Sequence, residues 1–262
     1  MGGTAPKPAN LRTMAIAIGV AVIVVVAAVL VLAYWGSTSS STGCPSSGCS
    51  PSLSVASFAG AVNNTPTIQP SPVRVPADSL VFVFVSYVNA LVGGGEPQWV
   101  NDSVGDSYAL VTTTALELNH TESLYVTAVA ESVSSLTVSV TFIGGRTPQG
   151  GSVAVVVVAG AVDEAIDGER QSIGTGAVAS VSLPTEHTGD LCVLGVAGRG
   201  VSAPFTAASG ETLLNTGAGT SGPFEDGTGY GTFSTVGPTS STVLSAHLNT
   251  PTGWDAIGVA VD

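Results

Sequence analysis

The chain has 262 residues, with 6 basic and 18 acidic side chains and a formal net charge of −12 at pH 7. Only 9% of its residues are charged, whereas 44% are hydrophobic. A nucleic-acid-binding protein needs a Lys/Arg-rich surface to displace counterions, so this composition excludes that class. The apolar content excludes a wholly disordered chain. What remains is a membrane-attached or exported protein with a large core.

The N-terminal part carries an apolar run at residues 14–35. Lys7 and Arg12 precede the run, which contains no charged residue. A helix needs about 20 apolar residues to cross a bilayer core, and this run has that length. By the positive-inside rule, residues 1–13 lie in the cytoplasm, and the chain that follows the apolar run lies outside. We therefore expect a single-pass cell-membrane protein with an uncleaved anchor; the alternative is a cleaved signal peptide.

Residues 36–52, GSTSSSTGCPSSGCSPS, follow the anchor. Small polar residues, Gly and Pro cannot bury enough apolar surface to fold, so this segment is predicted to be a flexible stalk. Cys44 and Cys49 lie within it, and an external location favours a disulfide between them. Bridges between neighbouring chains are the alternative. Cys192 stands alone in an apolar run and is expected to be a small buried hydrophobe.

Residues 53–262 predict an all-β extracellular domain. Short apolar or alternating runs, rich in β-branched and aromatic residues, are separated by Gly, Pro, Asn, Asp and Ser, which is typical of strands and turns. The Val-rich run at residues 153–158 contains neither Pro nor charge and should lie in the middle of its sheet. In the first half we expect strands at residues 53–58, 80–87, 107–112, 123–130, 136–142 and 152–159.

The second half repeats this order of strands. The six runs of the first half are matched in turn by residues 177–183, 190–197, 211–215, 229–236, 242–248 and 254–261. The two halves, about residues 53–160 and 170–262, therefore predict a jelly-roll-like or Ig-like β-sandwich. One compact sandwich is favoured, and two sandwiches are the alternative.

A turn motif in the first half carries a resemblance to known proteins. Residues 102–110, DSVGDSYAL, match the pattern D-S-x-G-[ND]-x-Y-x-L, and characteristic strands follow at residues 124–130, 137–142 and 153–160. In this order they resemble a group of secreted β-sandwich proteins found on bacterial and archaeal surfaces and in phage particles. The resemblance implies a prokaryotic source and a role in display, adhesion or contact with glycans. It implies no catalytic residue.

Acidic residues form two candidate groups. Asp102 and Asp106 bracket the turn of this motif, and Asp with Gly at such positions indicates turn geometry rather than a metal site. Asp163, Glu164 and Asp167 belong to an acidic loop and are weak Ca²⁺ candidates, since a solvated loop is the more ordinary interpretation. No carboxylate pair falls in a catalytic pattern, so we expect that the protein is not an enzyme and needs no cofactor.

The remaining candidates concern histidines and glycans. The three histidines, at 120, 187 and 247, have no metal-binding spacing and are expected at the surface or in turns. Asn63, Asn101 and Asn119 begin N-x-[ST] sequons and are candidate glycosylation sites on an external domain. Trp99 follows a Gly-rich stretch, where it would either form a sugar-stacking platform with Tyr87 or cap the end of the sandwich.

Together these features predict a non-enzymatic surface protein whose domain serves adhesion or surface structure. One alternative is a carbohydrate-binding module, with Trp99 as its contact residue. The other is a subunit of an extracellular filament or envelope layer, which an apolar strand exchanged between chains, such as residues 153–158, would favour. The expected partners are the membrane, a glycan, a neighbouring surface protein or a second copy of the chain.

Overall fold

The computed structural model describes residues 53–63, 65–88, 97–114, 120–143, 149–161, 166–199, 205–218, 228–237 and 240–262. These residues form β-strands joined by turns, so the predicted all-β sandwich is confirmed. Among them, no helix has the length and apolarity of a membrane span. The predicted anchor at residues 14–35 and the stalk with Cys44 and Cys49 lie outside the described residues.

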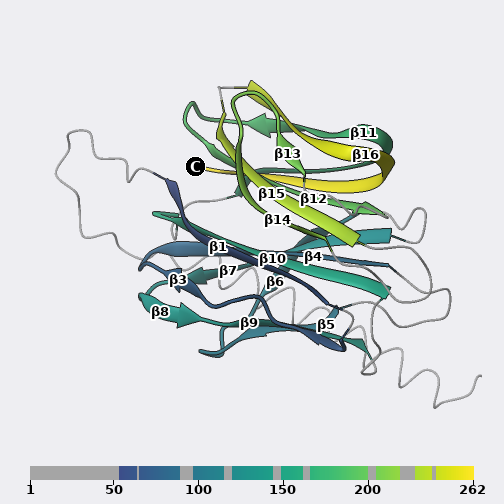
Figure 1. The fold of residues 1–262 in the computed structure, drawn as a ribbon. Coiled ribbons are helices and arrows are strands. Elements are labelled where there is room, and N and C mark those ends of the chain that lie inside the picture. Colours follow the sequence, from purple (N-terminus) through teal and green to yellow (C-terminus); the bar gives the residue numbers. More distant parts are fainter. Residues whose placement is uncertain are drawn as a thin grey trace, which may run out of the picture. The chain divides into compact units, whose positions relative to one another are not determined.

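The first half forms two layers (Figure 1). The larger is a sheet with the strand order β1-β10-β4-β7-β6. Its strands are β1 (Ser54–Asn63), β4 (Ser79–Val88), β6 (Ala109–Thr113), β7 (His120–Val129) and β10 (Gln149–Ala159). The smaller layer contains two ladders, β2-β9-β5 and β3-β8. Its strands are β2 (Thr67–Ile68), β3 (Val73–Val75), β5 (Pro97–Asp102), β8 (Val133–Leu136) and β9 (Val138–Phe142).

The second half repeats this plan with longer strands. Its two long strands pair with each other, and a register shift between Gly176 and Val178 marks the point where each passes from one layer to the other. The larger layer has the order β11-β16-β12-β15-β14, and β13 pairs with the remaining part of β16. The strands are β11 (Ile166–Thr185), β12 (Leu191–Arg199), β13 (Thr206–Ala207), β14 (Thr212–Ala218), β15 (Thr228–Val236) and β16 (Ser240–Val261).

Both halves have the strand order of a jelly roll. Each half has eight strand positions when β2 with β3, β8 with β9, and each of the two segments of β11 and of β16 are counted as one position each. The strand order of the large sheet is then first, eighth, third, sixth, fifth in both halves. The small layer runs second, seventh, fourth. The first strand lies beside the last because a long antiparallel hairpin is rolled up into two sheets. The internal repeat read from the sequence therefore corresponds to two jelly rolls.

One match within that repeat is wrong. Residues 177–183 lie in the second segment of β11 and correspond to β2 and β3, not to residues 53–58. The counterpart of β1 is the first segment of β11, residues 166–176, which pairs with the last segment of β16 as β1 pairs with β10. That segment was missed because its polar and glycine residues interrupt any apolar run.

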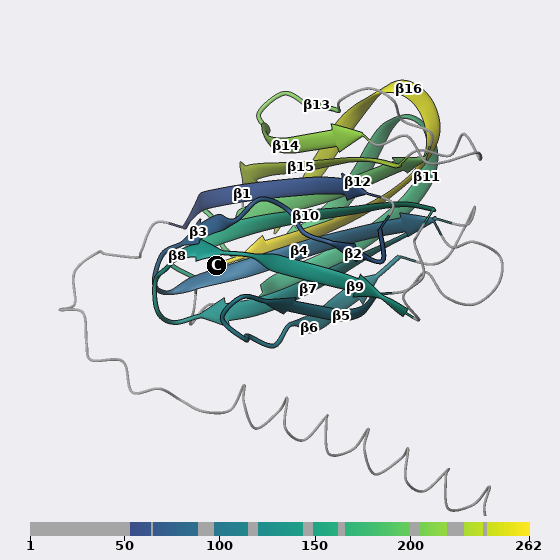
Figure 2. The same cartoon turned by 60° about the horizontal axis from the view of Figure 1, so that its bottom comes forward.

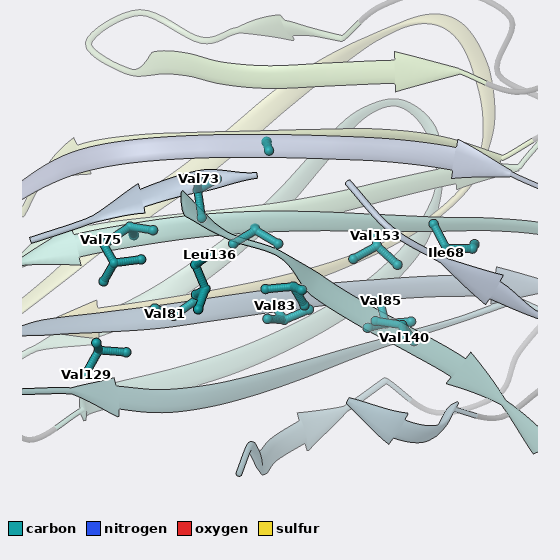
Figure 3. Close-up of a cluster of buried hydrophobic side chains, with 14 of the residues drawn as sticks. Ile68, Val73, Val75, Val81, Val83, Val85, Val129, Leu136, Val140 and Val153 are labelled. Atoms are coloured by element: carbon teal, nitrogen blue, oxygen red, sulfur yellow. The ribbon is translucent and has the colours of Figure 1, made fainter. Parts of the chain in front are cut away.

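Three clusters of buried apolar side chains hold the layers together. The first lies inside the first roll, where Val81, Val83 and Val85 of β4 face Leu136 and Val140 of the small layer (Figure 3). The third lies inside the second roll, between its own two layers. The second lies between the large sheets of the two rolls. The two rolls thus pack on each other, which replaces the single sandwich favoured from the sequence. The physical reason is that β4 and β10 are apolar on both faces, and each face needs a cover.

The two large sheets stack in opposite strand order (Figures 1 and 2). β1 faces β14, β10 faces β15, β7 faces β16 and β6 faces β11. The middle strands, β4 and β12, meet where the ring of Phe84 lies over Gly195. The rolls are therefore related by an approximate two-fold axis through these strands, like the subunits of a symmetric dimer joined into one chain.

The Val-rich strand β10 is central, as predicted. It pairs with β1 on one side and with β4 on the other, and its valines are buried on both faces. It is not an unpaired strand that a second chain could take up. Residues 153–158 therefore do not supply the unpaired apolar strand that would favour a strand-exchanged filament.

The contact between Phe84 and Gly195 generates the first prediction. A Cβ atom at position 195 would lie 2.2 Å from Cδ1 of Phe84 and 2.6 Å from its Cε1. Overpacking of a core typically costs about 1–3 kcal/mol. Gly195→Ala is therefore expected to lower the free energy of unfolding by about 1–3 kcal/mol. Urea unfolding measures the change, with the exposed Ser182→Ala as a control that should shift stability by less than about 0.5 kcal/mol.

Adding Phe84→Leu to Gly195→Ala tests the cause. If the clash with the ring is responsible, the double variant loses less stability than the sum of the two single variants. Additive losses would show that Gly195 matters for another reason.

Candidate functional site

Asp102 organises the turn of the sequence motif. Its Oδ1 accepts hydrogen bonds from the backbone N–H groups of Val104, Gly105 and Asp106 at 3.0, 2.8 and 3.1 Å. Its Oδ2 accepts a hydrogen bond from the hydroxyl of Tyr108 at 3.0 Å. Gly105 has φ of +93°, a region that favours glycine. These bonds occupy both oxygens of the carboxylate, so the turn interpretation holds.

Trp99 lies on the outward face of the three-stranded sheet β2-β9-β5. Its neighbour Val100 points inward to the core of the first roll, so Trp99 points to solvent, and 62% of its surface is exposed. The strand register places Thr67 and Thr141 in the same row across the sheet as Trp99. The hydroxyl oxygens of these two threonines lie 3.2 Å apart.

A second polar row runs beside the first. Asn101 pairs in register with Ser139, and Nε2 of Gln69 donates a hydrogen bond to Oγ of Ser139 at 2.6 Å. Asn101 is exposed. We call this surface the Trp99 face; it consists of Thr67, Gln69, Trp99, Asn101, Ser139 and Thr141. It combines a flat exposed ring with hydroxyl and amide groups that can donate and accept hydrogen bonds.

Tyr87 does not contribute to this face. Only 4% of its surface is exposed, and its ring packs edge-on against Phe142 with centroids 6.1 Å apart. The predicted platform of Trp99 with Tyr87 is therefore wrong, because Tyr87 belongs to the core face of β4. The neighbours of Trp99 come instead from β2 and β9, which the sequence could not place beside it.

The acidic loop leads to a different group of residues. Asp163 and Glu164 lie outside the described residues. Asp167 lies at one end of the second roll, close to His187 and Asp262. Nδ1 of His187 lies 3.1 Å from Oδ2 of Asp167 and 3.1 Å from Oδ2 of Asp262. The hydrogen bond with Asp167 and the negative charge of Asp262 raise the pKa of His187.

Asp190 adjoins these three residues. Its Oδ2 accepts a hydrogen bond from the backbone N–H of His187 at 3.2 Å, and burial raises the pKa of its carboxyl group. We call Asp167, His187, Asp190 and Asp262 the His187 cluster. Sequence reasoning expected His187 to be an ordinary surface or turn residue. No spacing signal could have found the cluster, because it forms where the start of β11, the end of β16 and the start of β12 lie side by side.

A buried carboxyl pair lies between the two rolls. Glu122 of β7 and Asp255 of β16 are on the facing sides of the two large sheets, and their exposed fractions are 2% and 4%. Burial first, and the negative charge of Asp255 second, raise the pKa of Glu122 well above its ordinary value. Oε2 of Glu122 is buried without a hydrogen-bond partner. Glu122 therefore keeps its proton in the folded protein under conditions where an exposed glutamate is ionised.

This pair generates a prediction about pH. Above the ordinary pKa of 4.5, the unfolded chain releases the Glu122 proton while the folded chain keeps it. Stability therefore falls as pH rises through this window, by up to about 1.4 kcal/mol per pH unit from this group. Glu122→Gln should remove that contribution, so its free energy of unfolding falls less steeply with pH than that of the unchanged protein. Urea unfolding at several pH values between about 5 and 7 measures the slopes.

The matched control is Glu131→Gln, because Glu131 is exposed at the end of β7. It should leave the pH slope as it is in the unchanged protein. Equal slopes in the Glu122→Gln variant and the unchanged protein would show that Glu122 is ionised in the folded state.

The remaining candidates are a cysteine and the sequon asparagines. Cys192 is fully buried and free, as expected, and burial raises the pKa of its thiol to about 12, so it is not a reactive nucleophile. The sequon residues Asn63 and Asn101 are exposed, and Asn119 lies outside the described residues.

No known protein family, curated protein or solved structure matches the chain.

Proposed function

We propose that this chain is a membrane-anchored cell-surface protein that displays a double jelly roll for adhesion or surface structure and catalyses no reaction. Residues 14–35 anchor it in the membrane with its N-terminus in the cytoplasm, and residues 36–52 hold the domain away from the bilayer. The apolar run, the basic residues before it and the acidic remainder of the chain support this orientation.

One observation carries the proposal: the large sheets of the two rolls cover each other. A jelly-roll sheet that binds a ligand across its outer face must leave that face uncovered. In this protein Phe82 and Val156 of the first large sheet are buried in the same cluster as Val193 and Ile257 of the second. Contacts with other molecules are therefore left to the small layers, the sheet edges and the loops. A closed scaffold with exposed outer surfaces and loops suits display.

Cysteine labelling tests the orientation. In spheroplasts that express the full chain, a membrane-impermeant maleimide should label Cys44 and Cys49 after mild reduction. Cys192 should stay unlabelled until the protein is denatured, because its thiol is buried with a raised pKa. In a Cys44→Ser/Cys49→Ser background, Thr4→Cys should be labelled only after lysis.

The reverse pattern, with position 4 labelled from outside and the stalk labelled only after lysis, would contradict the orientation. An alkaline carbonate wash gives a second readout. The full chain should stay with the membrane, and its release into the wash would indicate a cleaved signal peptide instead of an anchor.

The Trp99 face favours carbohydrate binding as a second candidate function. Sugars offer apolar C–H faces and ring hydroxyl groups, which an exposed indole and neighbouring amides and hydroxyls can contact. Trp99 with Asn101 and Thr141 provides such a combination on one rigid sheet. Adhesion would then be attachment to glycans through this face.

Binding of the full chain, in detergent, to a glycan array tests this candidate. Trp99→Ala should reduce binding to any recognised glycan at least ten-fold, about 1.4 kcal/mol, because the stacking surface is lost. Val243→Ala is the matched control, since Val243 is exposed to the same degree, 63% against 62%, on the outward face of β16. Equal binding by both variants would exclude the Trp99 face, and no binding by the unchanged protein would exclude the carbohydrate function.

A further inference from the structure

The His187 cluster has the composition and spacing of a metal-binding site. Asp167, His187 and Asp262 offer one imidazole nitrogen and two carboxylate oxygens, and these ligand atoms all lie within 4.8 Å of one another. Around a tetrahedral zinc ion with bonds of about 2.0–2.1 Å, neighbouring ligand atoms lie roughly 3.3 Å apart. The two distances of 3.1 Å from Nδ1 of His187 already match that value.

The fold fixes where these ligands lie. Val261 pairs with Ile166 on one side and with Leu191 on the other, so the start of β11, the end of β16 and the start of β12 form one row. Asp167 is the extra residue in the register shift between Ile166 and Gly168. A bulge at a strand end turns a side chain out of the regular alternation, and here it directs Asp167 toward His187.

Asp190 supplies an independent observation. Only 1% of this residue is exposed, and Oδ1 of its carboxyl group is buried without a hydrogen-bond partner. The carboxyl group lies within hydrogen-bonding reach of Asp167 and near the charge of Asp262. A buried carboxylate oxygen without a partner is costly, and repulsion from two neighbouring carboxylates adds to that cost. A cation held by Asp167, His187 and Asp262 would lie beside this carboxyl group and offset the repulsion.

We propose that Asp167, His187 and Asp262 bind a divalent metal ion of the zinc type, with the Asp190 carboxyl group holding the backbone N–H of His187 beside them. An imidazole nitrogen among carboxylates suits zinc and the neighbouring transition metals, whereas Ca²⁺ prefers sites made only of oxygen ligands. The site joins the ends of three adjacent strands of the second roll, so the metal would tie them together. This role is independent of adhesion and of the orientation in the membrane.

The test uses the full chain in detergent, in a Cys44→Ser/Cys49→Ser background so that stalk thiols do not bind the probe. Isothermal titration with Zn²⁺ should show one ion bound per chain. His187→Ala and, separately, Asp167→Asn should weaken Zn²⁺ binding at least ten-fold. His247→Ala, which removes an exposed histidine elsewhere on β16, should leave the affinity unchanged.

Two further readouts keep the result clear if a variant folds poorly. Zn²⁺ should raise the midpoint of thermal unfolding of the unchanged site and of His247→Ala, but not of His187→Ala. Co²⁺ should give a visible absorption spectrum that His187→Ala abolishes. Absence of Zn²⁺ binding, equal binding by the His187→Ala variant, or preference for Ca²⁺ over Zn²⁺ would overturn the proposal and leave a hydrogen-bonded ion cluster only.

Discussion

The contact of Phe84 with Gly195 is the constraint on which the rest of the arrangement depends. Facing sheets lie about 10 Å apart, so an aromatic ring on one sheet needs a small residue opposite it. Gly195 provides that space, because even one added carbon would overlap the ring. Beside this contact, the strands of the two large sheets meet in pairs from β1 with β14 at one edge to β6 with β11 at the other. Their shared layer then excludes water from two faces that would otherwise be exposed and apolar.

This packing has a direct consequence for function. The approximate two-fold arrangement uses equivalent faces of the two rolls, so the surface most suited to a binding cleft is the one that is covered. What remains exposed differs between the rolls. The first presents the polar Trp99 face on its small layer, and the second gathers the His187 cluster at the ends of three strands. A duplicated core therefore carries two unlike outer surfaces.

Two of the buried side-chain oxygens without a hydrogen-bond partner lie next to other carboxyl groups. Oε2 of Glu122 lies in the layer between the rolls, and Oδ1 of Asp190 lies beside the His187 cluster. In the first case the cost of burial is met by keeping a proton, which links the contact between the rolls to pH. In the second case the neighbouring groups are suited to a cation. Glu122 is held by its pairing with Ser86 of β4, and Asp190 lies directly before β12.

The sequence by itself determined the all-β class, most of the longer strands and most of the internal repeat, because alternation and apolar runs are local properties of a chain. It also identified the Asp102 turn, whose hydrogen bonds reach only six residues ahead. It did not predict the short strands β2, β3, β5 and β13. Only the tertiary structure decided that the rolls pack on each other, that Tyr87 faces the core and that Asp167 meets His187 and Asp262. These results depend on register and on which sheet face finds a cover, and both are set by contacts between residues far apart in the chain. A candidate site made from the ends of three strands therefore leaves no spacing in the sequence by which to find it.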